Sequence, residues 1–285
     1  SSKAGVVGRI AGRLAGATTV HTVHGFGFHA GASAIARKVL HGVERSMAPL
    51  TDWALCVSQA DLDYGSDHGL FSGQRASVIR AGIDIAAHRR DASAGQRLRS
   101  SLGFADDVPL VGTVACLKPQ KAPLEHIQAF ATLRVRVPNA QFLWVGDGVL
   151  RRAVIAEAER LGVADGLPLL GWTDEVPAIL SALDAFVLIS HWEGLPRALL
   201  EARAAGVPCV VSDRCGNPEA VGYGSAGFVV PAGATEEAGE RLAELLTNEA
   251  LHRGFAERSG EGLDGFDVRH IVPRHVELYD TLLVD

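Results

Sequence analysis

The chain has 285 residues, of which 47% are hydrophobic and 21% are charged. This composition is typical of a globular protein long enough for two domains, and it excludes a disordered chain. The net charge of −6 argues against a nucleic-acid partner. The four cysteines form no C-x-x-C pair and predict buried free thiols in a reducing cytoplasm. No apolar run approaches the roughly 20 residues that span a bilayer.

The first part of the chain predicts one helix followed by short strands. Residues 1–16 are typical of a helix, and strand-like runs follow at 17–24, 54–58 and 77–81. A doubly wound domain usually opens on a strand that leads into a glycine-rich turn. The opening helix therefore predicts that the first domain, which we place at residues 1–84, is incomplete and lacks this strand and turn.

Charge is distributed unevenly along the chain. Residues 1–50 carry a formal charge of +5 and the remainder −11, which favours a charged partner for the front of the chain. Between Gly31 and Leu50 a helix is expected with its apolar and basic side chains on different faces. This helix fits either peripheral contact with an anionic membrane or an ordinary domain helix with a solvated basic face. Its apolar side chains are Ile35, Val39, Leu40, Val43 and Met47, and its basic ones are Lys38, His41 and Arg45.

The second part of the chain alternates strand-like and helical runs. The alternation predicts a parallel sheet with helices on both faces, which we place at residues 109–265. Residues 85–108 lose the apolar periodicity and predict a linker, and residues 266–285 predict a terminal helix. The strands are expected at residues 109–115, 142–146, 167–171, 185–190, 209–212 and 227–231.

Two glutamates lie around a helix start between the strands at 185–190 and 209–212. Glu193 falls in a turn that ends in Pro196, a residue suited to the first helical position, and Glu201 lies inside the helix expected from about Arg197 to Ala205. The first amides of this helix have no intrahelical partner, so a diphosphate fits there. One acid is placed to hold a sugar hydroxyl and the other a ribose. The alternative is that both are solvated acids.

This acidic segment resembles the E-x7-E signature of family 4 glycosyltransferases. The resemblance implies the GT-B architecture, an α/β fold in which two Rossmann-like domains face each other and the C-terminal one holds most of the donor nucleotide. It also implies a terminal helix that crosses back onto the N-terminal domain. Further segments resemble the family in the order in which it uses them, at residues 21–26, 77–84, 111–121, 142–148, 169–176 and 215–221.

The resemblance assigns roles to individual side chains. It implies that Lys121 and Lys118 neutralise the leaving diphosphate, since electrostatic stabilisation dominates many active sites. Cys116 stands where the family usually has an arginine, so Lys118 is expected to substitute for the missing charge. The implied catalytic residues are His24, Lys121 and Glu193. The implied donor-binding residues are Lys118, Gly146, Trp172, Thr173, Gly194, Leu195, Pro196, Arg197, Leu200 and Glu201.

Several of these residues allow a second interpretation. His24 ends a strand-like run, so its ring is expected in the interdomain cleft near the sugar, although an isolated histidine is more often structural. Gly146 belongs either to a plain turn or to a ligand contact. Trp172 either packs against the nucleobase, beside the backbone at Thr173, or lies in the core. Glu219 is expected to support its own loop.

The sequence does not favour a metal site. His21, His24 and His29 are three and five residues apart, which directs successive rings to opposite faces of a strand. The segment Asp61-Leu62-Asp63 imitates the D-x-D of metal-dependent glycosyltransferases, but it lies where an aspartate would cap a helix.

The predicted function is that of a retaining, metal-independent hexosyltransferase without a cofactor. It would move a sugar from a UDP- or GDP-linked donor to a sugar or lipid-linked acceptor in bacterial cell-surface polysaccharide or glycolipid synthesis. Retention follows from the resemblance alone. The predicted location is cytoplasmic, with peripheral contact at the inner face of the plasma membrane as an open alternative. Two other functions stay open: a nucleotide-sugar 2-epimerase, and a nucleotide-sugar-binding module without turnover.

Overall fold

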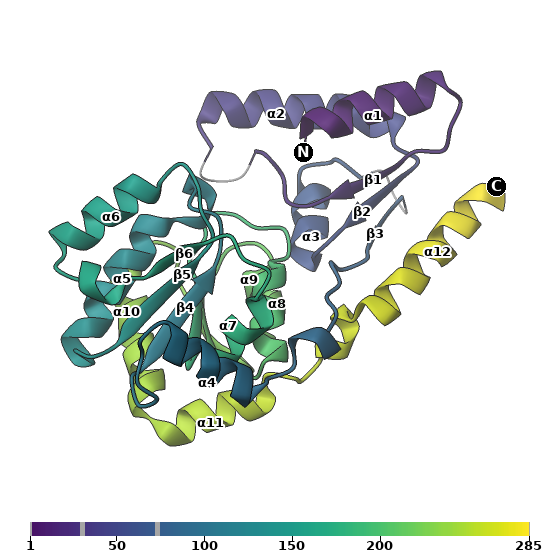
Figure 1. Cartoon of the computed structure of the whole chain (residues 1–285). Helices are drawn as coiled ribbons and strands as arrows, with labels where there is room; N and C mark the ends of the chain where they lie inside the picture. The colour runs from purple at the N-terminus through teal and green to yellow at the C-terminus, as the bar shows by residue number, and fades with distance from the viewer. Residues whose placement is uncertain (1, 29–31, 72–74, 285) are drawn as a thin grey trace.

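The computed structural model describes residues 2–28, 32–71 and 75–284 and contains two parallel sheets (Figure 1). The first sheet has the order β1-β2-β3, with β1 at Val20–Val23, β2 at Trp53–Cys56 and β3 at Ala76–Val78. Two helices, α1 (Ser2–Leu14) and α2 (Ala34–Met47), lie side by side above it in Figure 1. The predicted α/β class is confirmed.

Helices cover both faces of the first sheet. Successive side chains of a strand point to opposite faces, and β2 shows this directly. Cys56 packs in a cluster with Val23, next to α3 (Gln59–Asp67), whereas Leu55 packs with Ile79 and Ile271. Ile271 belongs to the terminal helix α12 (Val268–Val284), which thus lies against the first sheet although it ends the chain. A short helix, η1 (Ala48–Leu50), leads into β2.

The second sheet has six parallel strands in the order β6-β5-β4-β7-β8-β9. Counted from β4, this is the order 3-2-1-4-5-6 of a Rossmann sheet, in which the order of strand addition reverses between the first and fourth strands. This reversal of the strand order lies between β4 and β7. The strands are β4 (Leu110–Val114), β5 (Gln141–Val145), β6 (Leu169–Gly171), β7 (Ala185–Leu188), β8 (Cys209–Ser212) and β9 (Gly227–Val230).

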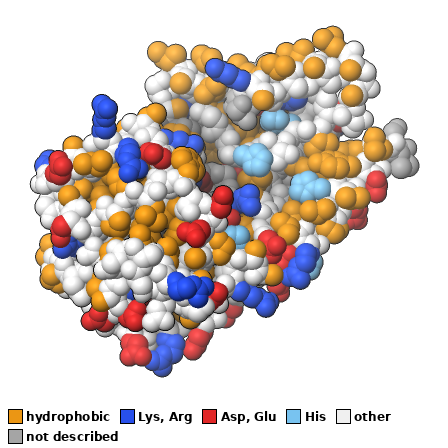
Figure 2. All heavy atoms as spheres, in the orientation of Figure 1, with side chains coloured by type: hydrophobic (Ala, Val, Ile, Leu, Met, Phe, Trp, Pro, Cys, Tyr) orange, Lys and Arg blue, Asp and Glu red, His pale blue; other side chains and the backbone are white. Residues whose placement is uncertain are grey.

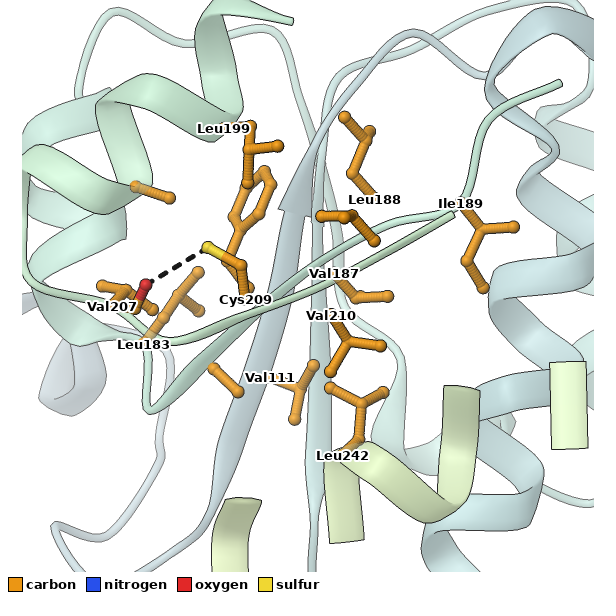
Figure 3. Close-up of a cluster of buried hydrophobic side chains, with 14 of the residues drawn as sticks. Val111, Leu183, Val187, Leu188, Ile189, Leu199, Val207, Cys209, Val210 and Leu242 are labelled. Carbon is orange, nitrogen blue, oxygen red and sulfur yellow. Dashed lines mark hydrogen bonds between the residues drawn. The ribbon is translucent and has the colours of Figure 1, made fainter. Parts of the chain in front are cut away.

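Two helix layers enclose this sheet, with α5 packed on α10 and α4 packed on α7. In Figure 3, Leu242 of α10 approaches Val210 from one side and Leu199 of α8 approaches Cys209 from the other. The helices are α4 (Ala92–Ser101), α5 (Pro123–Arg136), α6 (Arg151–Arg160), α7 (Val176–Ala182), α8 (Arg197–Ala204), α9 (Asn217–Ala220), α10 (Thr235–Thr247) and α11 (Glu249–Arg258). Short 3-10 helices are η2 (Ala86–His88), η3 (Pro119–Lys121), η4 (Ala164–Gly166) and η5 (Leu263–Phe266).

The cysteines divide into two kinds. Cys56 and Cys209 are fully buried, and burial raises the pKa of each thiol to about 12, so both are unreactive. Cys209 donates a weak hydrogen bond to the carbonyl of Val207 at 3.2 Å (Figure 3). Cys116 is only partly buried and Cys215 is exposed. The expectation of buried thiols is therefore correct for the two strand cysteines and wrong for the two loop cysteines.

The segment expected to be a linker contains a ten-residue helix, α4, that the sequence did not predict. Few apolar side chains mark this helix, because polar contacts hold it in place. The Asp91 side chain caps it by accepting from the amides of Ser93 and Ala94. Arg99 donates to the Ala182 carbonyl at 2.8 Å, and a Cβ atom at Gly95 would lie only 2.5 Å from the carbonyl oxygen of Ser181. Helix α11 was also not predicted.

Glu219 joins the two sheets. It belongs to α9, yet its Oε1 atom accepts from Arg80 at 2.6 Å and its Oε2 atom from the Gln59 amide at 2.8 Å. Arg80 follows β3 and Gln59 begins α3, so both partners belong to the first sheet's side of the molecule. The sequence predicts that Glu219 supports a loop rather than a ligand, and its contacts are with protein groups, although they reach beyond its own loop to the first sheet. The carboxylate holds the carboxyl ends of the two sheets together.

Glu219→Ala should lower the free energy of unfolding by roughly 1.5–3 kcal/mol, because it removes two hydrogen bonds to a charged group. Urea unfolding at pH 7 measures the loss. The matched control is Glu240→Ala, which removes an exposed partner of Arg136 and should cost about 1 kcal/mol or less. Equal effects of the two substitutions would contradict a role of Glu219 in joining the sheets.

Candidate active site

The loops at the carboxyl edge of the second sheet touch one another in a row. The amide of Gly146 donates to the carbonyl of Gly171 at 2.7 Å, and the amide of Leu117 donates to the carbonyl of Asp147 at 3.1 Å. The next contact joins the loops after β4 and β7, where the amide of His191 donates to the carbonyl of Gln120 at 2.9 Å. In open α/β sheets, ligands bind at the carboxyl ends of the two neighbouring strands between which the strand order reverses. Here that place lies between β4 and β7.

An ion pair occupies this position. The ammonium nitrogen of Lys121 lies 2.5 Å from Oε1 of Glu193, and the Glu193 residue is 5% exposed. Lys121 ends η3 after β4, and Glu193 lies in the loop after β7. The structure thus brings two of the three predicted catalytic residues into contact. Gln120 supports the pair, because its side-chain amide donates to the carbonyl of Trp192 at 3.0 Å.

The turn that presents Lys121 is held by a buried histidine. Ala122 has left-handed backbone angles (φ 40°, ψ 51°), a conformation that costs energy in a residue with a side chain. Nδ1 of His126 lies 3.1 Å from the Ala122 carbonyl, and Nε2 accepts from the amide of Ile189 at 3.0 Å. Burial lowers the pKa of His126 to about 4, which keeps the ring neutral with one donor and one acceptor. His126 therefore ties the start of α5 to the end of β7.

Sequence reasoning did not identify Gln120 or His126. Neither belongs to a motif with a recognisable spacing. The only available signal was a polar residue at position 126 on the apolar face of α5, next to Ile127 and Phe130.

Close backbone contact brings the first sheet to this site. A Cβ atom at Gly194 would lie 2.8 Å from the backbone carbon of His24, and one at Gly216 would lie 2.0 Å from the carbonyl oxygen of Gly194. Gly25 has a φ of +91° and also lies against the Glu193 backbone. The loops after β1, β7 and β8 are therefore packed backbone to backbone. Gly194 allows this close approach because it has no side chain. His24 lies at the same junction, and burial lowers the pKa of its ring.

Gly194→Ala should push these loops apart, because the added methyl group has no space next to the His24 backbone. Overpacking of this kind costs roughly 1–3 kcal/mol, and sugar transfer should fall with it. Thermal unfolding and transfer rate are the measurements. The control is Gly42→Ala in α2, where a Cβ atom meets nothing within 4 Å and the better helix former should stabilise by about 0.5–1 kcal/mol. A Gly194→Ala variant as stable as the wild type would contradict this packing.

Gly146 follows β5, and the two predicted base-binding residues, Trp172 and Thr173, follow β6. Gly146 is required by the turn, since its φ is +124° and a Cβ atom would lie 2.2 Å from the Ala115 carbonyl oxygen. Trp172 is 71% exposed, which excludes a place in the core and leaves its ring open to a ligand. The hydroxyl of Thr173 accepts from the amide of Glu175 at 3.1 Å.

The α8 residues differ in what they can contribute. Leu195 and Pro196 are buried at the start of the helix, where Pro196 is the cap and precedes the first helical residue, Arg197. Leu200 is completely buried in the core. Its side chain presents no surface to a donor, so the predicted donor contact of Leu200 would have to come from its backbone.

Glu201 is mostly buried and faces the segment after β3. Its Oε1 atom lies 3.9 Å from Arg197 and 4.0 Å from Nε2 of His88 in η2. Both distances exceed hydrogen-bond length. The carboxylate therefore retains its capacity to accept from hydroxyl groups. On the other side of the site, Lys118 is exposed. Cys116, which stands where the family usually has an arginine, is partly buried and brings no positive charge.

The metal candidates do not assemble into a site. Within residues 2–28, 32–71 and 75–284, no group of three or more His, Cys, Asp or Glu side chains is placed to hold a metal ion. His29 lies outside the described residues. Ser58, and not Asp61, caps α3, because the Ser58 hydroxyl accepts from the Asp61 amide at 3.1 Å. The helix-capping role expected for Asp61 is therefore wrong.

Comparison with solved structures identifies the fold. The chain superposes on HepE of Anabaena in complex with UDP and glucose with a TM-score of 0.87 and 24% identity, covering 98% of this chain and 76% of that one. It superposes on the sucrose-phosphate synthase of Thermosynechococcus elongatus with a TM-score of 0.86 and 21% identity, covering 97% and 71%. Two facing α/β units of this kind define a GT-B fold.

Sequence comparison then identifies the family. Residues 1–87 match the family described as Glycosyltransferase Family 4, and residues 95–261 match the family described as Glycosyl transferases group 1. The chain belongs to glycosyltransferase family 4. It is a glycosyltransferase, as the sequence predicted.

Two named relatives indicate the range of this family. The chain is 31% identical to the UDP-Gal:alpha-D-GlcNAc-diphosphoundecaprenol alpha-1,3-galactosyltransferase of Escherichia coli, over all of this chain and 75% of that protein. It is also 31% identical to a GDP-mannose-dependent alpha-(1-6)-phosphatidylinositol monomannoside mannosyltransferase of Mycobacterium tuberculosis, over 86% of this chain and 66% of that protein. The names of both relatives describe lipid-linked acceptors.

Proposed function

We propose that the chain transfers a hexosyl group from a UDP- or GDP-linked sugar to an acceptor hydroxyl, with retention at the anomeric carbon and without a metal ion or cofactor. The observation that carries this proposal is the contact between Lys121 and Glu193 at the carboxyl ends of β4 and β7, where the strand order reverses. A leaving diphosphate needs a nearby positive charge, and a sugar needs hydrogen-bond acceptors. The pair offers both.

In this proposal the second sheet forms the donor domain, at residues 109–265, and the first sheet the acceptor domain, at residues 1–84. The diphosphate takes Lys121 as its counter-ion, together with the first amides of α8, and Glu193 then accepts from the sugar. Glu201 accepts hydrogen bonds from the ribose. The distances from its carboxylate to His88 and Arg197, which exceed hydrogen-bond length, support this role. Trp172 covers the base.

Lys121→Ala should lower kcat by roughly a hundredfold or more, because the cation stabilises charge that grows in the transition state. The control is Lys3→Ala, which removes an exposed charge of α1 outside the loops of the site, and its loss of kcat should stay below about tenfold. Transfer from UDP-glucose, UDP-galactose and GDP-mannose to octyl glucoside or octyl N-acetylglucosaminide, in EDTA, measures both. Unfolding of Lys121→Ala/Glu193→Gln shows whether the unpaired Glu193 charge itself damages the fold.

Three outcomes would oppose the proposal. These are equal losses of kcat in the two lysine variants, a strict requirement for added magnesium or manganese, and an inverted anomeric configuration in the product NMR spectrum.

We also propose that the face formed by α1 and α2 contacts an anionic membrane that carries a lipid-linked acceptor. Within the described residues, no helix is long and apolar enough to cross a bilayer. Figure 2 shows hydrophobic side chains along the upper edge of the molecule, over these two helices. Four large apolar residues are more than half exposed there: Val7 and Leu14 of α1, and Ile35 and Val39 of α2.

The basic side chains of α2 differ in placement. Lys38 and Arg45 are exposed, at helical spacing from Ile35 and Val39, so apolar and basic groups share the outward face. The expectation that they lie on different faces is wrong for these residues. His41 is turned inward, with Nε2 3.0 Å from the His68 carbonyl. An outward face that mixes both kinds of side chain favours adsorption to anionic lipid.

Lys38→Glu/Arg45→Glu should weaken flotation with vesicles that contain anionic lipid, since each basic residue near the surface contributes about 1 kcal/mol. The binding should also fall with added salt. The control is Arg90→Glu/Arg97→Glu, which makes the same charge change at exposed positions around the start of α4. Equal flotation of both variants, or no flotation of the wild type at low salt, would make a soluble acceptor the better hypothesis.

A further inference from the structure

A cavity of about 260 Å³ lies between the two sheets. Its walls come from loops and helix starts at the carboxyl ends of strands of both sheets: Phe26 after β1, Asp61 and Tyr64 in α3, Trp192 and Glu193 after β7, and Cys215 after β8. We call it the interdomain cavity. Because Glu193 forms part of its wall, the cavity opens directly onto the proposed position of the donor sugar.

The size and lining of the interdomain cavity indicate what fits. It is smaller than the roughly 300–1,000 Å³ of sites for drug-sized ligands, so it holds one ring or the end group of a larger molecule. Phe26, Tyr64 and Trp192 supply aromatic surface, while Asp61 and Glu193 supply carboxylate oxygens. Aromatic faces next to acidic hydrogen-bond acceptors suit a neutral ring that carries hydroxyl groups.

Asp61 is the unusual member of this wall. The residue is only 4% exposed, and its Oδ2 atom has no hydrogen-bond partner in the described part of the chain. The pKa of Asp61 is raised to about 7, chiefly by burial and also by the nearby charge of Glu219, against the opposing effect of hydrogen bonds from Ser58 and Gly25. A buried carboxyl group with an unsatisfied oxygen destabilises a fold.

The local structure uses only part of this carboxyl group, through the hydrogen bonds from Ser58 and Gly25. Ser58 already caps α3, and Glu219 rather than Asp61 binds the Gln59 amide at the start of that helix. The two other buried carboxylates at the junction are paired, Glu193 with Lys121 and Glu219 with Arg80. Within the described residues, Asp61 pairs with no cation and does not cap α3, and its contacts with Ser58 and Gly25 leave the Oδ2 atom without a partner.

We propose that Asp61 binds the acceptor: Oδ2 accepts a hydrogen bond from a hydroxyl of a neutral sugar ring held in the interdomain cavity, and thereby selects and orients that acceptor. This inference rests on the proposed function, because it presumes a donor sugar at Glu193. It assigns the acceptor's reactive end a chemical class, a ring that turns a hydroxyl and not a phosphate or carboxylate group toward Asp61, since this unpaired carboxylate would repel an anion placed against it.

The first test compares the stability of Asp61→Asn with that of the wild type. The substitution removes the buried acid, so the melting temperature at pH 8 should rise by about 2 °C or more. Because the pKa of Asp61 is raised in the folded state, its cost to stability is full above about pH 7 and is lost progressively as the pH falls toward the unfolded-state pKa of about 4. The rise should therefore shrink at pH 5. The surrounding titratable groups, which both proteins share, are Cys56, His191, Glu193, Arg214, Cys215 and Glu219.

The second test measures acceptor use with octyl glucoside and octyl N-acetylglucosaminide as probes. Asp61→Asn should raise the acceptor KM by roughly 10- to 100-fold, the loss expected for one hydrogen bond to a charged group. The Kd for UDP or GDP should stay within about twofold of the wild type, because Asp61 lies on the acceptor side. The control is Asp63→Asn, an exposed acid in the same helix, which should change neither value.

Each result decides one question. An Asp61→Asn protein that is less stable than the wild type at pH 8 makes Asp61 structural and overturns the inference, whether or not sugar is transferred. An unchanged acceptor KM overturns it as well. Failure of the proposed function is seen separately, as a wild-type protein that neither binds UDP or GDP nor transfers sugar to the probes.

Discussion

The close contact between the loops of the two sheets is the constraint on which the site depends. A side chain at Gly194 has no space, because the backbone at His24 lies against it, and Gly216 closes the other side. Parallel strands of one sheet end at the same edge, so two such edges that face each other collect every functional loop in one place. The ion pair, the interdomain cavity and the bridge made by Glu219 all lie along this junction.

The buried carboxylates at the junction differ in whether a cationic side chain pairs with them. Lys121 with Glu193, and Arg80 with Glu219, are pairs in which each ion offsets the cost of burying the other. Such pairs add little net stability, but the loss of either partner leaves an uncompensated charge. Among the residues that the structure describes, Asp61 has no such partner. A fold that keeps an unpaired acid next to a cavity gives up stability at that point, which is typical of residues retained for a ligand.

Much of the second domain was predictable from the chain alone. Strands that alternate with amphipathic helices require a parallel sheet, and the segment from β7 to β8 formed as expected, with α8 beginning at Arg197. The first sheet was also predictable, although its three strands are only three or four residues long. Helix α4 was not, because an aspartate cap, an arginine anchor and a glycine contact hold it instead of an apolar stripe.

The sequence by itself determined the fold class, the family and the presence of Lys121, Glu193 and Glu201 near one sheet edge, because the alternation of strands and helices and the spacing of motifs are properties of the chain order. Only the tertiary structure decided which side chains face a ligand. The sequence shows that Leu200, Ile35 and Val39 are apolar. It does not show that Leu200 of α8 lies in the core while Ile35 and Val39 of α2 face outward. The environment of Asp61 was equally hidden, since burial and the lack of a cation arise from elements distant in the chain.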